Sequence, residues 1–144
     1  MSMEPIQIVI DTNIVVSAAR SRRGTSFELL SMLDTGAFKI NLSQALILEY
    51  EEKLKQLAKP KGPEALALVD RFLDYLISMA NTTTVPVSLR DGAHEADQFV
   101  LDLAVASRAR FIVTYNKRHY VGAGAYGVEA IAPYEFLRFL GDMQ

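Results

Sequence analysis

The hydrophobic positions of the chain fall into two alternating patterns. Short runs rich in apolar, β-branched or aromatic residues predict strands, and the first of them reads as fully buried. Pro86 places the third run at the edge of a sheet, because proline cannot donate a hydrogen bond to a neighbouring strand. The runs are residues 6–10, 38–42, 82–87, 111–114 and 128–131.

Between these runs, apolar residues recur at helical spacing. Ser43 is a good N-cap, and Thr25 with Glu28 has the spacing of a capping box. Pro63 and Pro133 suit the first turn of a helix. The pattern predicts helices at residues 13–19, 25–33, 43–57, 63–80, 95–107 and 133–140, with loops at 20–24 and 90–94.

The order of these elements predicts the class of fold. Strands alternate with helices, which favours an α/β fold around a mainly parallel sheet. No repeat or interdomain linker interrupts the pattern, and 144 residues lie within the usual size of one domain. We therefore expect a single domain over residues 1–144.

Composition narrows the class of protein further. The chain is 50% hydrophobic and 22% charged, which supplies a core and argues against disorder. The absence of cysteine excludes disulfides and thiolate zinc sites. We see no signal peptide and no run long enough for a membrane helix, so we expect a cytoplasmic protein. The net charge of −2 is only weak evidence against a nucleic-acid partner, because acids in a metal site would offset basic residues elsewhere.

Asp11 stands directly after the first predicted strand. In open α/β sheets, sites form at the carboxyl ends of strands, so this carboxylate should project at that edge. An aspartate between a strand and a helix is also a common N-cap. The position alone leaves both interpretations open.

A second carboxylate stands out in the helix predicted at 95–107. Asp97 falls on the same face as Val100, Leu101 and Ala104, whereas Asp102 falls on the opposite face, where solvent would hydrate it. A carboxylate on an inward face must be paired, hydrogen-bonded, protonated or metal-bound. The helix dipole is worth only about 0.3–1 kcal/mol, so something else should compensate Asp97.

The helix predicted at 43–57 carries three glutamates. Glu52 points away from the apolar stripe, and Glu49 and Glu51 lie on its two borders. Periodicity cannot choose between these two. Three acids near one sheet edge would repel one another, and a bound Mg²⁺ or Mn²⁺ with oxygen ligands would relieve this. Such an ion suits phosphodiester hydrolysis.

Other chemistries find less support in the sequence. His94 and His119 are far apart along the chain, and each is expected to be a loop or surface residue. There is no P-loop or nucleophile elbow, and GAGAYG at 122–127 has the wrong spacing for a dinucleotide site. A phosphatase with Asp11 as nucleophile would need a second aspartate where this chain has Asn13.

Three segments in order resemble the motif blocks of the PIN-domain family, in particular its VapC-like bacterial toxins. The segments are IVIDTNIVVSA, LSQALILEYEEKL and ADQFVLDLAVASRARFIVTYNKRHY. The resemblance implies a PIN-like three-layer α/β/α sandwich and a Mg²⁺- or Mn²⁺-dependent ribonuclease. It matches Asp11, Glu49 and Asp97 to the metal-binding acids, and so selects Glu49 over Glu51.

The resemblance also indicates further residues of the site. Asn116 stands where the family often has a fourth acid, and His119 where an aspartate is common. Because neither position holds an acid here, the resemblance does not establish that a second metal ion binds. Asn13, Thr114 and Ser17 would orient the acids or a bound water.

The leading hypothesis is a toxin ribonuclease in which Asp11, Glu49 and Asp97 hold metal and Asn116 assists. Basic residues would steer the RNA backbone: Arg20, Arg22, Arg23, Lys117 and Arg118. The resemblance implies a small antitoxin as partner and a homodimer, with Phe27, Leu30, Phe72 and Tyr75 as candidates for its face. The alternative is a non-catalytic PIN-like module that binds RNA or an antitoxin.

Overall fold

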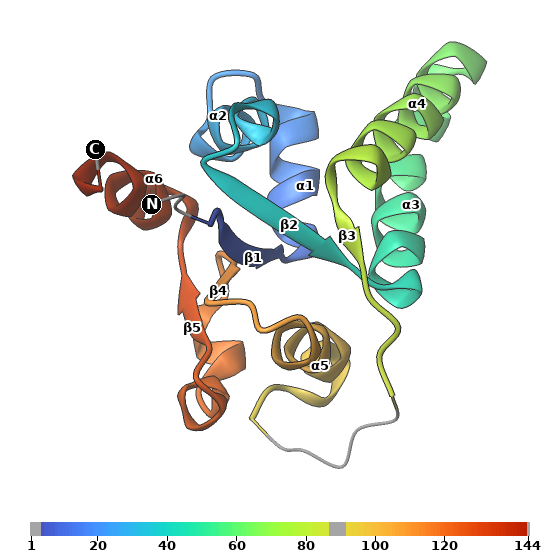
Figure 1. The fold of residues 1–144 in the computed structure, drawn as a ribbon. Helices are drawn as coiled ribbons and strands as arrows, with labels where there is room; N and C mark the ends of the chain where they lie inside the picture. The colour runs from blue at the N-terminus through green and yellow to red at the C-terminus, as the bar shows by residue number, and fades with distance from the viewer. Residues whose placement is uncertain (1–3, 87–91, 144) are drawn as a thin grey trace.

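The fold is built on a five-stranded sheet. In a computed structural model of the chain, residues 4–86 and 92–143 are described. The strands are β1 (Ile6–Ile10), β2 (Phe38–Leu42), β3 (Asn81–Thr82), β4 (Phe111–Val113) and β5 (Glu129–Ile131). Their order is β3-β2-β1-β4-β5, and every neighbouring pair is parallel (Figure 1). The prediction of an α/β fold with a mainly parallel sheet is confirmed.

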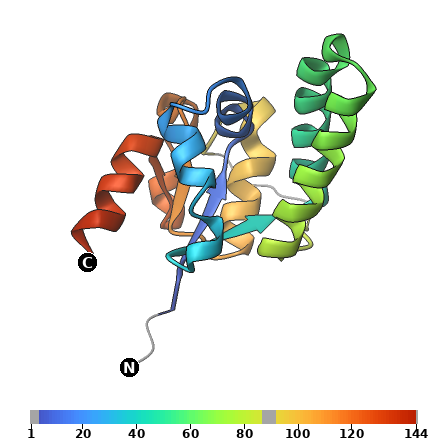
Figure 2. The same cartoon turned by 90° about the horizontal axis from the view of Figure 1, so that it is seen from above.

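Helices cover both faces of this sheet. They are α1 (Thr12–Arg20), α2 (Thr25–Leu30), α3 (Gln44–Ala58), α4 (Pro63–Met79), α5 (Gln98–Ala106) and α6 (Pro133–Asp142). Helices α1 and α2 lie on one face and α5 on the other, while α3 and α4 pack together beside β3 (Figure 1). The view from above shows α6 near α2, at the opposite end of the molecule from the α3–α4 pair (Figure 2). These layers confirm the PIN-like α/β/α sandwich.

Short 3-10 helices complete the chain and matter for the site. They are η1 (Leu33–Thr35), η2 (Lys59–Lys61), η3 (Glu95–Asp97), η4 (Lys117–Tyr120) and η5 (Ala123–Tyr126). Within the described residues, no helix combines the length and apolarity needed to cross a membrane.

Several predicted elements are shorter than expected, and β3 is shortened the most. The strand predicted at 82–87 is confined to Asn81–Thr82, and residue 87, like residues 90–91 of a predicted loop, lies outside the described residues. Thr83 N still donates to Leu42 O (2.8 Å), but β2 ends there and Ser43 caps α3. Beyond this point β3 has no backbone of β2 to pair with, so its edge position is right and its length is wrong.

Helix α2 ends before the predicted residue 33. Gly24 rather than Thr25 is its N-cap, and the Gly24 carbonyl accepts from Glu28 N (3.2 Å). The chain then tightens into η1 and turns at Gly36, whose φ of 79° suits glycine. The apolar pattern that predicted one helix at 25–33 therefore covers two elements, α2 and the beginning of η1.

The core is packed around the central strands. Ile8 and Val9 of β1 are fully buried, and Phe136 of α6 is enclosed between rings from two strands. Its centroid lies 5.5 Å from Phe38 and 5.6 Å from Phe111, both edge to face. The central strands are thereby held rigidly, and their carboxyl ends form a fixed edge for a site.

Candidate active site

Asp11 is both a helix cap and a candidate site residue. Its backbone N donates to Val113 O (2.9 Å), which extends the β1–β4 ladder by one residue. Its Oδ1 accepts from Thr12 N (2.9 Å) as the N-cap of α1. Its Oδ2 accepts from Thr114 Oγ1 (2.8 Å) and Tyr120 OH (3.0 Å). The N-cap interpretation is therefore confirmed, and the carboxylate also lies at the carboxyl edge of the sheet, where its role in a site stays a prediction.

Burial makes the Asp11 charge unfavourable. The side chain is only 6% exposed, and desolvation raises the pKa of its carboxyl above the ordinary value, with a further rise from the nearby charge of Asp97. The hydrogen bonds from Thr114, Tyr120 and Thr12 N lower the pKa but do not cancel the rise. Without a cation, the Asp11 carboxylate is held in a setting that penalises its charge.

Tyr120 is a hydrogen-bond partner of the candidate site residue Asp11 that sequence reasoning missed. Burial and the neighbouring carboxylates of Asp11, Asp97 and Glu49 raise the pKa of the Tyr120 hydroxyl far above its usual range, so it remains a donor. It belongs to the quoted motif, but periodicity offered no signal for it. Only the turn of η4 brings it back under Asp11.

Thr114 holds the neighbouring polar groups in place. It is fully buried, and its hydroxyl accepts from Asn116 N (3.0 Å) and Asn13 Nδ2 (3.4 Å) while donating to Asp11. Asn13 Oδ1 in turn accepts from Tyr115 N (3.4 Å). The ends of β1 and β4 are thus joined by a small network around one carboxylate.

Glu49 reaches the same region from α3. Its neighbour Tyr50 is buried and donates its hydroxyl to Ile10 O, which fixes α3 against the end of β1. Burial raises the pKa of the Glu49 carboxyl, followed by the charges of Asp11 and Asp97. All three carboxylates line the same cleft, although their oxygens do not all lie within 4.8 Å of one another.

Two neighbours, Thr12 and Lys53, lower the pKa of the Glu49 carboxyl. The Thr12 hydroxyl is buried without a hydrogen bond of regular geometry, yet it and the Lys53 ammonium lower the pKa of Glu49.

The other two acids of α3 have different surroundings. Glu51 pairs with Lys55 (3.3 Å), and Glu52 is exposed.

Asp97 lies at the start of α5 rather than within it. The 3-10 turn η3 rotates it off the apolar stripe, so it is half-buried, and its Oδ2 lies 3.0 Å from His119 Nδ1. The expectation that a partner compensates this acid is met by His119.

One further prediction is wrong. Asp102, predicted to be solvated, is buried at 8% exposure and accepts from Gln98 Nε2 (3.0 Å), because α5 is enclosed on every side along Val100–Ala104. His94 is an exposed loop residue and His119 a partly exposed residue of η4, as expected, but nothing in the sequence indicated that their rings stack at 4.2 Å.

Seven of the predicted site residues line one open cleft of about 570 Å³. Its lining includes Asp11, Glu49, Asp97, Asn116, Asn13, Ser17 and Arg20, together with Thr12, Val16, Lys53, His94, Ala96 and His119. The three acids do not form a tight cluster. Among the described residues, the one set of three His, Asp or Glu ligand atoms within 4.8 Å of one another is that of His94, Asp97 and His119.

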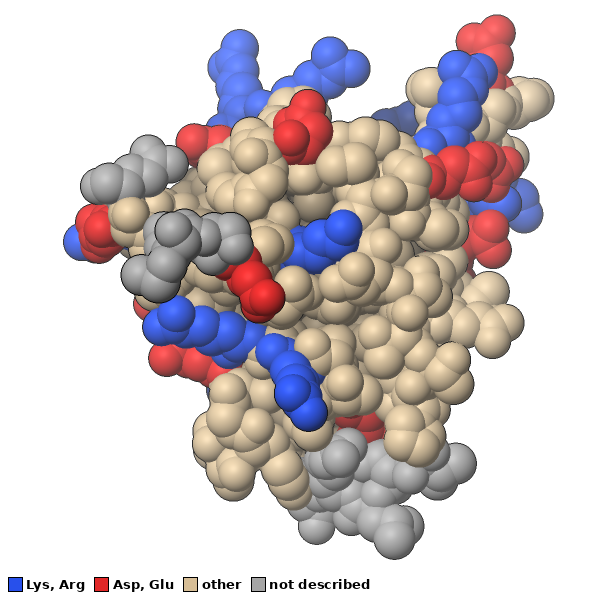
Figure 3. Space-filling model, in the orientation of Figure 1, with Lys and Arg blue, Asp and Glu red and all other residues tan. Residues whose placement is uncertain are grey.

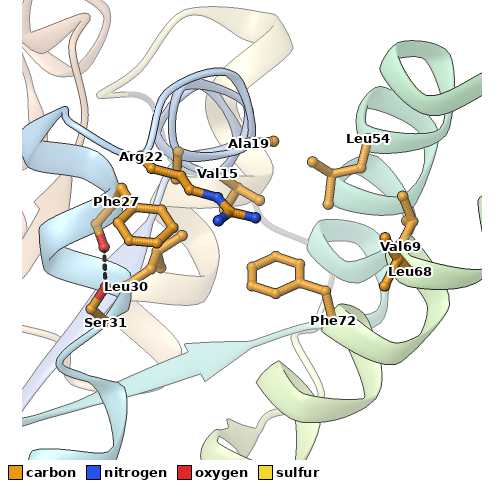
Figure 4. A pocket seen from close by; sticks show the side chains of 11 residues that line it. Val15, Ala19, Arg22, Phe27, Leu30, Ser31, Leu54, Leu68, Val69 and Phe72 are labelled. Carbon is orange, nitrogen blue, oxygen red and sulfur yellow. Dashed lines mark hydrogen bonds between the residues drawn. The ribbon is translucent and has the colours of Figure 1, made fainter. Parts of the chain in front are cut away.

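The other predicted basic residues lie away from the cleft. Arg22 lines a separate apolar cavity of about 450 Å³, where its guanidinium points between Phe27 and Phe72 (Figure 4). Lys117 pairs with Glu135 (2.7 Å), and Arg23 and Arg118 are exposed. On the face shown in Figure 3, basic and acidic side chains are interspersed.

The sheet order and the carboxylate cleft define a parallel three-layer α/β/α domain with an acidic site at the carboxyl edge of its strands. The sequence profile of the PIN domain family matches residues 7–118. The chain therefore belongs to the PIN domain family.

Two solved structures share this fold. One is a chain from the crystal structure of VapBC2 from Rickettsia felis bound to a DNA fragment from their promoter, with 17% identity and a TM-score of 0.55 over 87% of this chain and 98% of that one. The other is a domain of a functionally unknown protein from Methanocaldococcus jannaschii, with 16% identity and a TM-score of 0.50 over 88% and 90%. No curated protein matches the chain.

Proposed function

We propose that the protein is a metal-dependent endoribonuclease of the PIN type that hydrolyses RNA phosphodiester bonds. One observation carries the proposal. Asp11, Glu49 and Asp97 come from three separate segments and line one cleft, where burial first, and the charge of a neighbouring acid after it, raises the pKa of the Asp11 and Glu49 carboxyls. A fold retains such repulsion where a bound cation relieves it.

The donor set fits Mg²⁺ or Mn²⁺. Asp11, Glu49 and Asp97 offer oxygen ligands, which hard divalent ions prefer. Mg²⁺ typically uses one or two carboxylates and keeps several waters, so a spread set of acids is compatible with it. When bound, such an ion supplies Lewis acidity at the phosphate and lowers the pKa of a coordinated water.

The residues of the chain would position the metal-binding carboxylates and attract the RNA backbone. Thr114 and Tyr120 hold Asp11 in the lining of the cleft, and Asn116 adds an uncharged amide there. Arg20 and Lys53 supply positive charge in the same cleft and would attract the RNA backbone.

Single-turnover cleavage of RNA with Mg²⁺ or Mn²⁺ tests the proposal. We expect Asp97→Asn to lower the cleavage rate by at least about 100-fold, since even residues that only support a metal ligand often cost 10–100-fold. The matched control is Glu52→Gln, an exposed acid one turn from Glu49, which should cleave like the wild type. Equal cleavage by wild-type and Asp97→Asn protein would remove the mechanism.

One observation favours the alternative of a non-catalytic module. Asn116, in the cleft, brings no charge where the family often has an acid. Calorimetric titration with Mn²⁺ separates the two readings. Absence of heat at millimolar Mn²⁺ from folded protein would favour a module that binds RNA or an antitoxin without cutting.

The toxin role and its partners are proposed from the family resemblance. We propose a cytoplasmic toxin with a small antitoxin partner, and a homodimer. Of the four candidate residues for the dimer face, Phe27, Leu30 and Phe72 line the apolar cavity between α1, α2, α3 and α4, and Tyr75 is exposed. Purification from the native host tests partnership: recovery without a small companion protein would count against the toxin role.

A further inference from the structure

Two short segments beside the cleft are clamped together by their backbones. His94 N donates to His119 O (2.8 Å), and Gly122 N donates to Gly92 O (3.0 Å). The two glycines are in such close approach that a Cβ on Gly122 would lie 2.5 Å from Gly92 Cα. This geometry holds η3 and η4 in one register and presents their side chains together.

The clamp brings three potential ligands to one point of the cleft. The rings of His94 and His119 stack with an interplanar angle of 10°, and one ligand atom from each histidine and from Asp97 lie within 4.8 Å of one another. His119 Nδ1 and Asp97 Oδ2 are 3.0 Å apart. Two ligand atoms at about 2.1 Å from one ion would be about 3.0 Å apart at the right angle of octahedral coordination and about 3.4 Å apart at the tetrahedral angle usual for Zn²⁺.

The chemistry of this set differs from that of the acidic site. Two imidazoles and a carboxylate suit borderline first-row transition ions such as Mn²⁺, Co²⁺ or Zn²⁺, whereas Mg²⁺ prefers oxygen ligands. Three protein ligands in an open cleft leave positions for water or a phosphate oxygen.

We propose that His94, Asp97 and His119 form a transition-metal site that shares Asp97 with the carboxylate site. The site deepens the proposed nuclease function and rests on it for the role of Asp97. His119 and His94 thereby supply nitrogen ligands beside Asn116, which carries no charge. The cleft would prefer transition ions to Mg²⁺.

Histidine ring nitrogens provide the direct test, because the chain has only two histidines. Protein without a purification tag and with ¹⁵N-labelled histidine is titrated with Zn²⁺ and followed by NMR of the ring nitrogens. We expect both rings to respond and to saturate near one equivalent, while millimolar Mg²⁺ leaves them unchanged. No response, a response that needs millimolar Zn²⁺, or an equal response to Mg²⁺ overturns the proposal.

Substitutions separate this proposal from that of the nuclease. His94→Gln and His119→Gln should each weaken Zn²⁺ binding at least tenfold, measured by competition with a chromophoric chelator. Asp11→Asn should lower RNA cleavage yet keep the response of both rings. Cleavage with Mg²⁺ without a histidine response overturns the transition-metal site alone, and a histidine response without any cleavage by the wild type overturns the nuclease alone. Amide spectra of each variant verify its fold.

Discussion

At the scale of single residues, Asp11 depends on the donors around it. Three hydrogen bonds hold its two oxygens, and each of these bonds favours the charged form that a metal requires. Tyr120 and Thr114 both donate to Oδ2, so neither is a passive neighbour. Removing one donor should therefore change metal binding through the pKa of Asp11.

We expect Tyr120→Phe to raise the pKa of Asp11 further above its ordinary value. Because metal binding needs the carboxylate, Mn²⁺ affinity should fall by about 10–100-fold at acidic pH and by less at pH 8. Calorimetric titrations at several pH values measure this. Tyr134→Phe, at an exposed tyrosine on α6, is the control. An equal loss of affinity at all pH values would mean that Tyr120 acts through packing.

Glu49 should reveal its raised pKa in the stability of metal-free protein. Between the ordinary pKa and the raised one, the folded state binds more protons than the unfolded state, so stability falls as the pH rises through this window. Glu49→Gln removes that loss. We expect it to raise the melting temperature at pH 7 and to leave it unchanged well below pH 4.5, where Glu49 is protonated in both states.

Thermal unfolding in the presence of chelator measures the difference, and Glu52→Gln serves as control. An excess of Mn²⁺ should reverse the order at pH 7, because the variant loses a metal ligand. A variant no more stable than the wild type at pH 7 without metal would contradict the unfavourable charge at Glu49.

Local signals predicted some site residues and not others. Asp11 could be predicted because it directly follows a strand, and Glu49 lay on a border that only the family resemblance resolved. Tyr120 and His94 escaped because their roles depend on the turn of η4 and on a contact between segments distant in sequence. Asp102 was misjudged because periodicity assumes a solvated face that α5 does not have.

At the scale of elements, α3 is attached to the sheet through Tyr50. Its hydroxyl donates to Ile10 O at the end of β1, directly before Asp11. The helix and the strand are thereby held in one register, so that Glu49 and Asp11 face the same cleft.

Tyr50→Phe should lower the free energy of unfolding by about 1–3 kcal/mol, because it leaves a buried carbonyl without this donor. Urea denaturation measures the loss, with Tyr134→Phe as the control. We also expect weaker Mn²⁺ binding at 25 °C, where the variant remains folded. Loss of stability with unchanged Mn²⁺ affinity would show that this bond does not position Glu49.

The first residue of a helix could be predicted where a capping serine or a first-turn proline marks it. The limits of other elements were harder to predict. Ser43 accepts from Leu46 N (3.2 Å), and Pro63 and Pro133 begin α4 and α6 as expected. The limits of β3 and α2 depend on where a neighbouring strand ends and on backbone geometry at Gly24. Such tertiary constraints leave no periodic trace in the sequence.

At the scale of the whole molecule, the strand order explains where the cleft lies. The chain passes from β1 to β2 and β3 on one side, then returns to β4 and β5 on the other. The crevice between β1 and β4 is therefore the switch point at which ligands bind in open α/β sheets. Asp11 and Thr114, separated by 103 positions, meet there. Alternation of strands and helices predicted the class of sheet but not this order.

The distribution of charge over the molecule leads to a prediction about RNA binding. The net charge is −2, so we expect little long-range steering by the molecule as a whole, and on the face in Figure 3 basic and acidic side chains are interspersed. Attraction should come from Arg20 and Lys53 in the cleft. Each phosphate contact with single-stranded RNA contributes about −0.7 to the slope of log K against log salt, which predicts a shallow slope of about −1.4.

Arg20→Gln should reduce this slope by about 0.7, whereas Lys117→Gln, at a lysine paired with Glu135 outside the cleft, should leave it unchanged. Fluorescence anisotropy with a short labelled RNA, in chelator to prevent cleavage, measures both slopes. A reduction by Lys117→Gln with no change for Arg20→Gln would mean that the phosphate track runs over η4 rather than through the cleft. In that case Lys117 and Arg118, and not Arg20, would be the residues that guide the strand toward the carboxylates.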